Sequence, residues 1–320
     1  MKLLVTGGAG FIGSNFIRHM LDTHPDYSIV NLDSLTYAGN LNNLKGYDTC
    51  PHYTFIRGDI CDPTLVNTVM EKHGIDTVVH FAAESHVDRS ITDASVFVKT
   101  NVLGTHTLLE AAKGKNIHRF IHISTDEVYG SRREGSFRET DNLSPSSPYS
   151  SSKAGSDLLA LSYHTTFNLP VIVTRCTNNF GPFQFPEKLI PLFITNLIDG
   201  KKVPIYGSGK NVRDWIHVQD HCHAIDFLLK KGNSGEIYNI GGKNEKTNIE
   251  ITEKILKLLK KDDSMVEYVQ DRPGHDFRYS LDSSKLRTLG WKPSHSFEEG
   301  LIDTVSWYAQ NEWWWRPLKR

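Results

Sequence analysis

The feature that most constrains the fold is a short apolar run that leads directly into closely spaced glycines. Lys2–Thr6 predicts a β-strand, and the run that follows, Gly7-Gly-Ala-Gly-Phe-Ile-Gly13, contains the pattern Gly8-x-Gly10-x-x-Gly13. An amphipathic helix is predicted to continue to about Thr23. Glycines in this pattern permit a tight turn, a close approach of the backbone to a pyrophosphate, and close packing of the helix on the strand. The chain is therefore expected to begin with a dinucleotide-binding strand–helix unit.

An acidic residue supports this interpretation and indicates which dinucleotide is bound. The second predicted strand, Ser28–Leu32, ends in Asp33, about 20 residues past the glycines, where a carboxylate holds the ribose hydroxyls. Its charge would repel a 2′-phosphate, and Ser34 supplies no compensating arginine. The expected cofactor is NAD, not NADP. The alternative is a glycine turn with an unrelated loop aspartate.

Strands and helices then alternate along the chain. Further strands are predicted at 54–57, 77–81, 119–124 and 171–175, with helices at about 64–73, 94–113 and 149–167. Such alternation predicts an α/β fold with a Rossmann-type doubly wound parallel sheet, whose ligands bind beyond the carboxyl ends of the strands. Those ends carry polar or small residues: Gly7, Asp33, Gly58-Asp59, Ala82-Ala83-Glu84, Thr125-Asp126-Glu127 and Cys176-Thr-Asn-Asn179.

The pattern changes after Asn179. Residues 1–179 are expected to form the NAD-binding domain, to which 213–241 returns, and 180–212 with 242–320 a smaller mixed α/β substrate domain. Further helices are predicted at 188–199, 218–231, 249–260 and 298–310, and strands at 203–206 and 236–240.

One edge of the predicted sheet concentrates groups suited to acid–base chemistry. The adjacent carboxylates Asp126 and Glu127 follow the strand at 119–124. Tyr149 and Lys153 are four residues apart at the start of a predicted helix, which places them on one helix face. The alternatives are a solvated acidic turn and a surface tyrosine and lysine.

Composition excludes several classes of function. The 320 residues carry a net charge of −1, so no basic surface suggests nucleic acid or an anionic membrane as a partner. No apolar run is long enough for a membrane span, and the start lacks a signal-peptide layout. Four cysteines without paired spacing indicate reduced thiols and a cytoplasmic protein.

Histidines suggest a metal site only weakly. The chain has 15, and His217-x-x-x-His221-x-His223 is the one cluster with suggestive spacing. No acidic or cysteine ligands accompany it at a known spacing, and the start of a predicted helix makes two of the three surface residues. No metal is therefore expected.

Several motifs together resemble a known family. The glycine motif and the Tyr149-x-x-x-Lys153 pair resemble the extended short-chain dehydrogenases/reductases, and almost the whole chain is similar to the dTDP-glucose 4,6-dehydratase family. The motifs that carry this similarity are Leu35-Thr-Tyr-Ala-Gly-Asn40, Ala82-Ala-Glu-Ser-His-Val-Asp-Arg-Ser90, Ser124-Thr-Asp-Glu-Val-Tyr-Gly130, Asn178-Asn179, Pro186-Glu-Lys-Leu-Ile-Pro191, Arg213-Asp-Trp215 and Asp271-Arg-Pro-Gly-His275. The segment between Glu127 and Tyr149 is shorter than in many members.

The resemblance implies a reaction and a role for each catalytic group. The hexose is oxidised at carbon 4, water is eliminated across carbons 5 and 6, and hydride returns to carbon 6, giving the 4-keto-6-deoxy sugar. Tyr149 would take the hydroxyl proton at carbon 4, assisted by Thr125 and Lys153. Glu127 would abstract the proton at carbon 5, and Asp126 would protonate the departing hydroxyl.

The resemblance also implies two sets of binding residues. The expected cofactor contacts are Gly7, Gly10, Phe11, Ile12, Gly13, Asp33, Ser34, Leu35, Thr36, Asp59, Ile60, Ala82, Ala83, Glu84, Thr100, Tyr149, Lys153 and Asn179. The expected sugar-nucleotide contacts are Ser85, Thr125, Asn178, Lys188, Leu189, Pro204, Ile205, Tyr206, Arg213, Asn239, Asp271, Arg272 and His275.

Other functions remain open at this point. A related enzyme could act on UDP- or CDP-glucose, or could be a 4-epimerase, which needs no acid for water loss. A more remote alternative is a non-catalytic NAD-sensing module. The resemblance implies a homodimer formed through the helices at about 94–113 and 149–167, and the triplet Trp313-Trp-Trp315 is expected to anchor the C-terminal segment.

Overall fold

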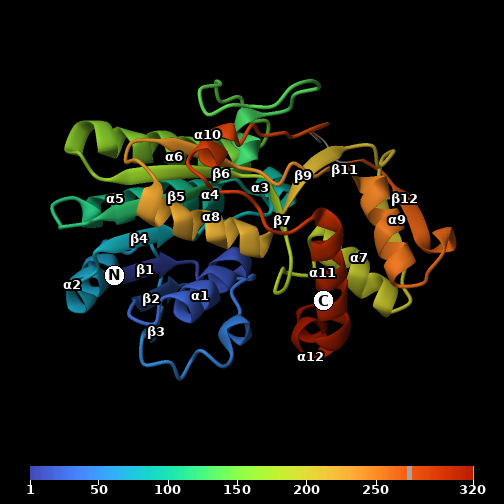
Figure 1. The fold of residues 1–320 in the computed structure, drawn as a ribbon, viewed down its shortest axis with the longest axis horizontal. Helices are drawn as coiled ribbons and strands as arrows, with labels where there is room; N and C mark the ends of the chain where they lie inside the picture. Colours follow the sequence, from blue (N-terminus) through green and yellow to red (C-terminus); the bar gives the residue numbers. More distant parts are fainter. Residues whose placement is uncertain (272–275, 320) are drawn as a thin grey trace.

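The computed structural model describes residues 1–271 and 276–319, in which a seven-stranded parallel sheet forms the centre (Figure 1). Its strands are β1 (Lys2–Thr6), β2 (Ser28–Asp33), β3 (Tyr53–Arg57), β4 (Thr77–His80), β5 (Arg119–Thr125), β6 (Val171–Cys176) and β10 (Ile237–Ile240). They lie in the order β10-β6-β5-β4-β1-β2-β3. This order confirms the predicted doubly wound sheet, whose switch point lies between β1 and β4.

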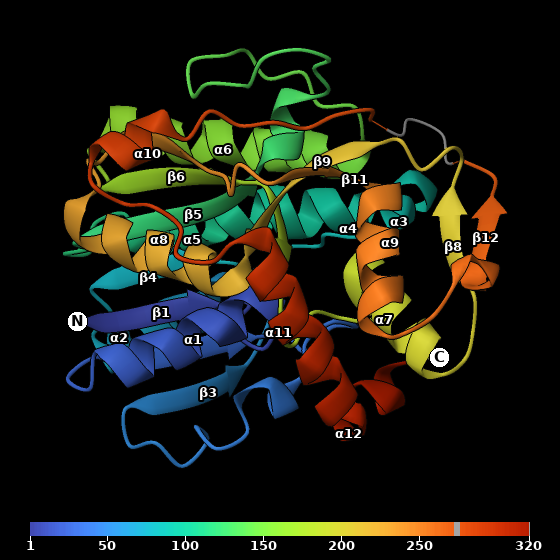
Figure 2. The ribbon, with the colours of Figure 1, turned by 45° about the vertical axis from the view of Figure 1, so that its right-hand side comes forward.

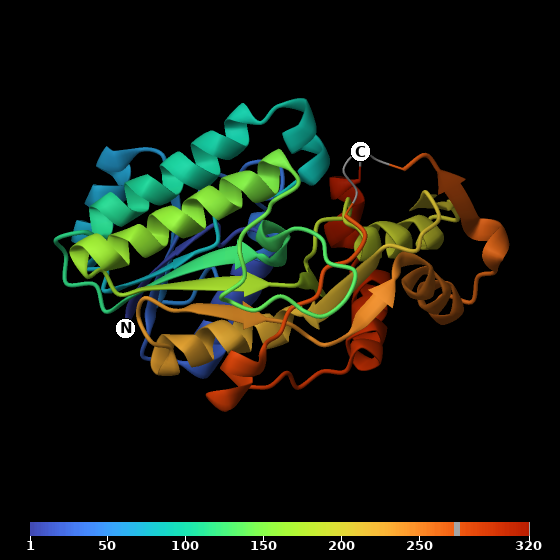
Figure 3. The same ribbon diagram turned by 90° about the horizontal axis from the view of Figure 1, so that it is seen from above.

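Helices cover both faces of the sheet, as Figure 3 shows from above. On one face α1 (Phe11–Thr23) packs on α8 (Val218–Lys231), and on the other α5 (Thr105–Ala112) lies between α2 (Pro63–His73) and α6 (Pro148–Phe167). Each helix turns an apolar stripe to the strands: Phe16 and Ile225 are fully buried on the first face, and Leu108 and Ala160 on the second. The short α10 (Ser284–Thr288) packs on β10 and adds Leu286 to the first core.

The start of α6 is fixed by local sequence. Ser147 caps the helix by accepting a hydrogen bond from the backbone of Ser150, whose side chain in turn accepts one from the Ser147 backbone. Pro148 occupies the first turn, where its missing N–H costs nothing. These signals place Tyr149 in the first turn and Lys153 in the second.

The predicted helix at 94–113 is not one continuous α-helix. It consists of α4 (Ser95–Phe97), a π-helical segment (Val98–Gly104) and α5. Asn101, inside the π segment, donates to the backbone oxygen of Glu84 and accepts from its backbone nitrogen. The wider turn therefore brings a buried amide to the loop after β4, which is followed by α3 (Val87–Thr92). Periodicity alone cannot reveal this irregularity.

A second unit lies beside the edge where the main strands end (Figure 2). One small sheet has the order β11-β9-β7, and β12 pairs with β8. The strands are β7 (Asn178–Phe180), β8 (Val203–Tyr206), β9 (Val212–His217), β11 (Glu245–Thr247) and β12 (Val266–Val269). The helices are α7 (Leu189–Ile198), α9 (Asn248–Leu258), α11 (Phe297–Gln310) and α12 (Glu312–Trp315). Four short 3₁₀ segments in the described residues complete the chain: Leu41–Leu44, Asp126–Tyr129, Asp263–Met265 and Arg316–Leu318.

The C-terminal tryptophans divide between core and surface. Trp314 and Trp315 are buried in the core that α7, α9 and α11 share, whereas Trp313 is half exposed. The indole N–H of Trp314 donates to the Asn43 side chain over 2.8 Å. Two members of the triplet, Trp314 and Trp315, therefore anchor the end of the chain, whereas Trp313 does not. Throughout the described ranges, every helix is too short or too polar to cross a membrane.

Candidate active site

A cleft of about 540 Å³ runs along the carboxyl ends of the main strands. All five predicted catalytic residues line it, together with every predicted cofactor contact except Leu35. The cleft begins at the glycine turn after β1 and continues past the ends of β2, β4, β5 and β6. The sequence prediction that these residues meet at one edge of the sheet is confirmed.

The glycine turn has a shape that side chains would destroy. Gly7 has φ of +71°, and a Cβ atom there would lie 2.6 Å from the backbone nitrogen of Ala82. A Cβ atom at Gly13 would lie 2.4 Å from the carbonyl oxygen of Gly7. The first turn of α1 therefore packs directly on the turn, and its backbone is open to the cleft. This cradle fits a pyrophosphate at a helix N-terminus.

Asp33 lies at the end of β2, in the position predicted for the ribose-binding carboxylate. Its two oxygens accept hydrogen bonds from the backbone nitrogens of Ala9 (2.9 Å) and Leu35 (2.8 Å). Burial raises the pKa of Asp33, and these two hydrogen bonds oppose the rise. The carboxylate ties the glycine turn to the loop after β2 and still lines the cleft. A ribose diol at this point would find a fixed acceptor.

Tyr149, Lys153 and Thr125 converge at the end of β5. Tyr149 and Lys153 are 9% and 4% exposed, so both are screened from bulk water. Burial and the charge of Glu127 raise the pKa of Tyr149, whereas a hydrogen bond from Thr125 lowers it. The Lys153 ammonium donates to the carbonyl oxygen of Ile123 over 2.7 Å. Its pKa is lowered to about 8 by burial, and Asp157 opposes that shift.

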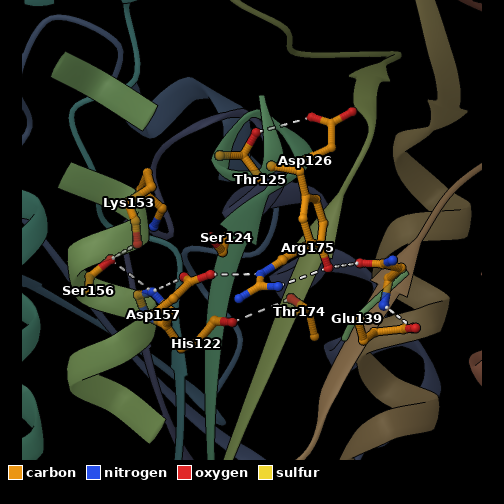
Figure 4. A network of polar contacts seen from close by, with 12 residues as sticks. His122, Ser124, Thr125, Asp126, Glu139, Lys153, Ser156, Asp157, Thr174 and Arg175 are labelled. Atoms are coloured by element: carbon orange, nitrogen blue, oxygen red, sulfur yellow. Dashed lines mark hydrogen bonds and ion pairs between the residues drawn. The ribbon is translucent and has the colours of Figure 1, made fainter. Parts of the chain in front are cut away.

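The two neighbouring carboxylates lie in different environments. Asp126 is 2% exposed and accepts a hydrogen bond from Thr125 at Oδ1 (3.2 Å; Figure 4), while its Oδ2 has no hydrogen-bond partner among the described residues. Burial, then the charge of Glu127, raises the pKa of Asp126 well above its usual value. Glu127 is partly buried and lines the cleft. Asp126 is therefore suited to hold a proton that it can donate, beside a carboxylate that can accept one.

The predicted sugar-nucleotide contacts divide into two groups. Ser85, Asn178 and Lys188 line the cleft along with Thr125, and Lys188 donates to the carbonyl oxygen of Ser85 over 3.4 Å. Leu189, Pro204, Ile205, Tyr206 and Asp271 lie farther into the second unit, outside the residues that line the cleft. Of these, Tyr206 is 42% exposed. Arg272 and His275 lie outside the described residues.

Arg213 lies close to the catalytic groups but turns its guanidinium to the protein. It donates to the backbone oxygens of Val212 and Asp276 over 2.8 and 2.9 Å. Its guanidinium carbon lies 4.3 Å from the centre of the Tyr279 ring, and its charge acts to lower the pKa of Asp126.

The prediction that Asn239 contacts the substrate is wrong. Its side chain is fully buried, and the side-chain amide donates to the backbone oxygens of Phe137 and Asp282 and accepts from Tyr129. The end of β10 points this residue to the 130–147 loop, away from the cleft.

A cluster at the mouth of the cleft was missed by the sequence prediction. The Arg89 guanidinium lies 3.8 Å above the Tyr37 ring, and Glu187 approaches both Arg89 (3.7 Å) and His86 (3.5 Å). Tyr37 and Glu187 line the cleft, as does Lys99. The sequence did contain a signal for this cluster, because all four residues lie in the family motifs: Tyr37, His86, Arg89 and Glu187. The contacts of Glu187 with His86 and Arg89 join the second unit to the first, and such contacts between distant segments cannot be predicted from sequence alone.

The expectation that two of the three clustered histidines are surface residues is also wrong. His217 and His221 are buried, and only His223 is exposed. His221 lies 2.9 Å from the Asn179 oxygen, and burial lowers its pKa to about 3, so the neutral ring orients that amide. The helix beginning at Val218 packs on α1 and on strands β5, β7 and β9, which buries the face that sequence reasoning placed in solvent. No group of metal-ligating side chains occurs in residues 1–271 and 276–319.

Comparisons with known proteins agree with this geometry. The sequence model of the GDP-mannose 4,6-dehydratase family matches residues 4–304. A dTDP-glucose 4,6-dehydratase of Streptomyces niveus is 56% identical, over 100% of this chain and 96% of that protein. The structure of a dTDP-glucose 4,6-dehydratase of Streptomyces venezuelae, solved with NAD bound, is 55% identical with a TM-score of 0.96 and covers 100% of both chains.

Epimerases share the fold at lower identity. The UDP-glucose 4-epimerase of Thermus thermophilus, solved with NAD, is 30% identical with a TM-score of 0.90, over 97% of this chain and 100% of that one. The fold is therefore common to both activities, whereas the higher identity favours the dehydratases. The chain belongs to the dTDP-glucose 4,6-dehydratase family of the extended short-chain dehydrogenases/reductases.

Proposed function

We propose that the protein is an NAD-dependent hydro-lyase that converts dTDP-glucose to dTDP-4-keto-6-deoxyglucose and water. The family supports this proposal, and the glycine cradle and Asp33 fit the pyrophosphate and adenosine ribose of NAD. Bound NAD would accept hydride from carbon 4 of the sugar and return it at carbon 6. The residues of the chain have to move protons and hold the sugar.

The oxidation step needs a base for the carbon 4 hydroxyl. Tyr149 would take this proton while Thr125 hydrogen-bonds the same oxygen. The pKa of Tyr149 is raised by burial, so a nearby positive charge is required before the phenolate can form at neutral pH. The Lys153 ammonium supplies one such charge within the cleft. Each positioned proton transfer contributes typically 10²–10⁴-fold to the rate.

The observation that carries the assignment is that the buried Asp126 and the cleft-facing Glu127 lie side by side near Tyr149. Once carbon 4 is a ketone, the proton at carbon 5 becomes acidic enough for Glu127 to remove. Asp126, whose pKa is raised by burial, would protonate the departing carbon 6 hydroxyl. A 4-epimerase has no use for this second acid, so the pair favours a dehydratase over the epimerases of the same fold.

The second unit would hold the sugar nucleotide. We assign residues 1–179 and 218–241 to NAD binding, and residues 180–217 and 242–320 to the substrate. The expected return to the first unit at residue 213 moves to 218, because β9 (Val212–His217) pairs with β7 and β11 in the second unit. Lys188, which lines the cleft, would bind the diphosphate. Arg213 would join it by exchanging the backbone oxygens of Val212 and Asp276 for phosphate oxygens. The exposed ring of Tyr206 could stack on the pyrimidine. We propose a cytoplasmic location, in keeping with four unpaired cysteines.

We further propose that the protein is a homodimer. Four apolar side chains are each about half exposed: Val98 and Leu103 on the π segment, and Leu158 and Phe167 on α6. A second copy packed on this face would bury them. Light scattering in solution should give twice the mass of one chain.

The experiment that tests the activity is product mass spectrometry. The purified protein with NAD should convert dTDP-glucose to a sugar nucleotide lighter by one water. UDP-glucose and CDP-glucose in parallel reactions should react more slowly. A product of unchanged mass, or a preference for UDP- or CDP-glucose, would contradict the proposal.

A further inference from the structure

A buried arginine beneath the site contacts the two segments that carry its catalytic groups (Figure 4). Arg175, on β6, is 2% exposed. Its Nε donates to Asp157 Oδ2 over 2.9 Å, and its Nη1 donates to the hydroxyl oxygen of Tyr129 over 2.8 Å. Asp157 belongs to α6, and Tyr129 ends the 3₁₀ helix Asp126–Tyr129. One guanidinium therefore joins the helix of Tyr149 and Lys153 to the helix of Asp126 and Glu127.

The contacts on the α6 side lie one turn beyond Lys153. The second carboxylate oxygen of Asp157 is 3.3 Å from His122 Nε2, which is also 3.1 Å from the Ser156 hydroxyl. Ser156 donates to the backbone oxygen of Lys153 over 2.8 Å. Burial and the charge of Lys153 lower the pKa of His122 to about 4, so its ring is neutral. Asp157, His122 and Ser156 thus fix the turn of α6 that presents Lys153.

The contacts on the carboxylate side hold Tyr129. Its ring stacks on Phe137 with centroids 5.1 Å apart and planes 8° apart, and its hydroxyl donates to Asn239 Oδ1 over 2.9 Å. Tyr129 is 1% exposed. Asp126 and Glu127 begin the same four-residue helix. Fixing its last residue therefore limits how far the two carboxylates can shift relative to α6.

We propose that Asp157, Arg175 and Tyr129 are positioning residues. They fix the groups that act in oxidation, Tyr149 and Lys153, relative to those that act in elimination, Asp126 and Glu127. This inference rests on the proposed dehydratase function, in which one sugar must react first with Tyr149 and then with Glu127 and Asp126. A sugar fixed by the cofactor cannot follow a displaced carboxylate, and a misplacement of about 1 Å can cost roughly 10²-fold in rate. The network serves neither substrate binding nor proton transfer directly.

Tyr129→Phe removes the hydroxyl and keeps the ring that stacks on Phe137. With dTDP-glucose and the NAD-loaded enzyme, rapid mixing should show nicotinamide reduction at the wild-type rate. Product formation should slow roughly 10- to 100-fold, so reduced cofactor accumulates. Tyr238→Phe is the matched control: Tyr238 is buried next to Asn239, and its hydroxyl accepts only from the backbone of Asn233 among the described contacts. It should leave both steps unchanged.

Asp157→Asn tests the other end of the network. It keeps an acceptor for Arg175 but removes the charge beside Lys153, so nicotinamide reduction should slow more than elimination. Thermal unfolding and NAD binding would first show that both variants are folded. The proposed positioning role is contradicted if both variants slow nicotinamide reduction and product formation in equal proportion, or if they slow neither step. If the wild-type enzyme forms no dehydrated product, the proposed function itself is wrong. Failure of the proposed function can therefore be distinguished from failure of the proposed positioning role.

Discussion

At the residue scale, environment distinguishes two adjacent carboxylates of similar chemistry. Asp126 is enclosed and lacks a partner for Oδ2 among the described residues, whereas Glu127 faces the cleft. The sequence could predict the pair and its place at the end of β5. It could not predict which carboxylate is enclosed, because the groups around Asp126 include Arg213 and Asp214, which are nearly 90 residues away in the sequence.

The raised pKa of Asp126 has a measurable consequence for stability. In the unfolded chain the carboxyl ionises near its ordinary pKa, but in the folded protein it stays protonated to higher pH. The folded state therefore loses stability as pH rises from about 4 towards the raised pKa. Asp126→Asn removes this titration and should lose less stability than wild type between about pH 4 and 8.

Denaturant titrations across that pH range would measure the effect. As pH rises, the free energy of unfolding of Asp126→Asn should increase relative to that of wild type. Asp263→Asn, on the short 3₁₀ segment Asp263–Met265 far from the site, is a control that should run parallel to wild type. A pH-independent difference for Asp126→Asn would mean that Asp126 is not protonated in the folded enzyme.

At the element scale, regular patterns were predicted closely and irregular ones were not. β1, β8 and α8 have the predicted bounds, since apolar periodicity and turn residues mark them. The π segment at Val98–Gly104 and the small sheet β11-β9-β7 were missed, because each depends on partners from other parts of the chain. The burial of His221 was missed for the same reason.

The C-terminal helix offers a test of how the second unit is anchored. Trp314 is 2% exposed and packs against Phe183, Trp307 and Tyr308. Trp314→Ala should lower stability by about 3–5 kcal/mol, the usual cost of deleting a buried aromatic side chain. Trp313→Ala is the matched control, since Trp313 is half exposed and meets only the Lys45 ammonium, 4.9 Å from its ring, among the ring contacts described. It should cost about 1 kcal/mol or less, and equal losses of thermal stability would contradict this anchoring.

At the scale of the whole molecule, the active site is a product of topology. The order of the main sheet brings Gly7, Asp33, Thr125 and Asn179 to one edge although they are spread over more than half of the chain. The sequence predicted this edge because parallel strands end on the same side. It could not predict how the second unit packs against this edge, which brings Glu187 to Arg89.

The central claim is that oxidation and elimination use separate groups in one cleft, with Tyr149 serving the first step and Glu127 the second. Glu127→Gln tests it most directly. The NAD-loaded variant is mixed rapidly with dTDP-glucose, and nicotinamide absorbance and product mass are followed together. The control is Glu134→Gln, a substitution at an exposed loop position. The proposed mechanism requires reduction of the nicotinamide to persist while the dehydrated product is lost, by roughly 10²-fold or more. Equal loss of both signals in the variant would contradict the division of roles.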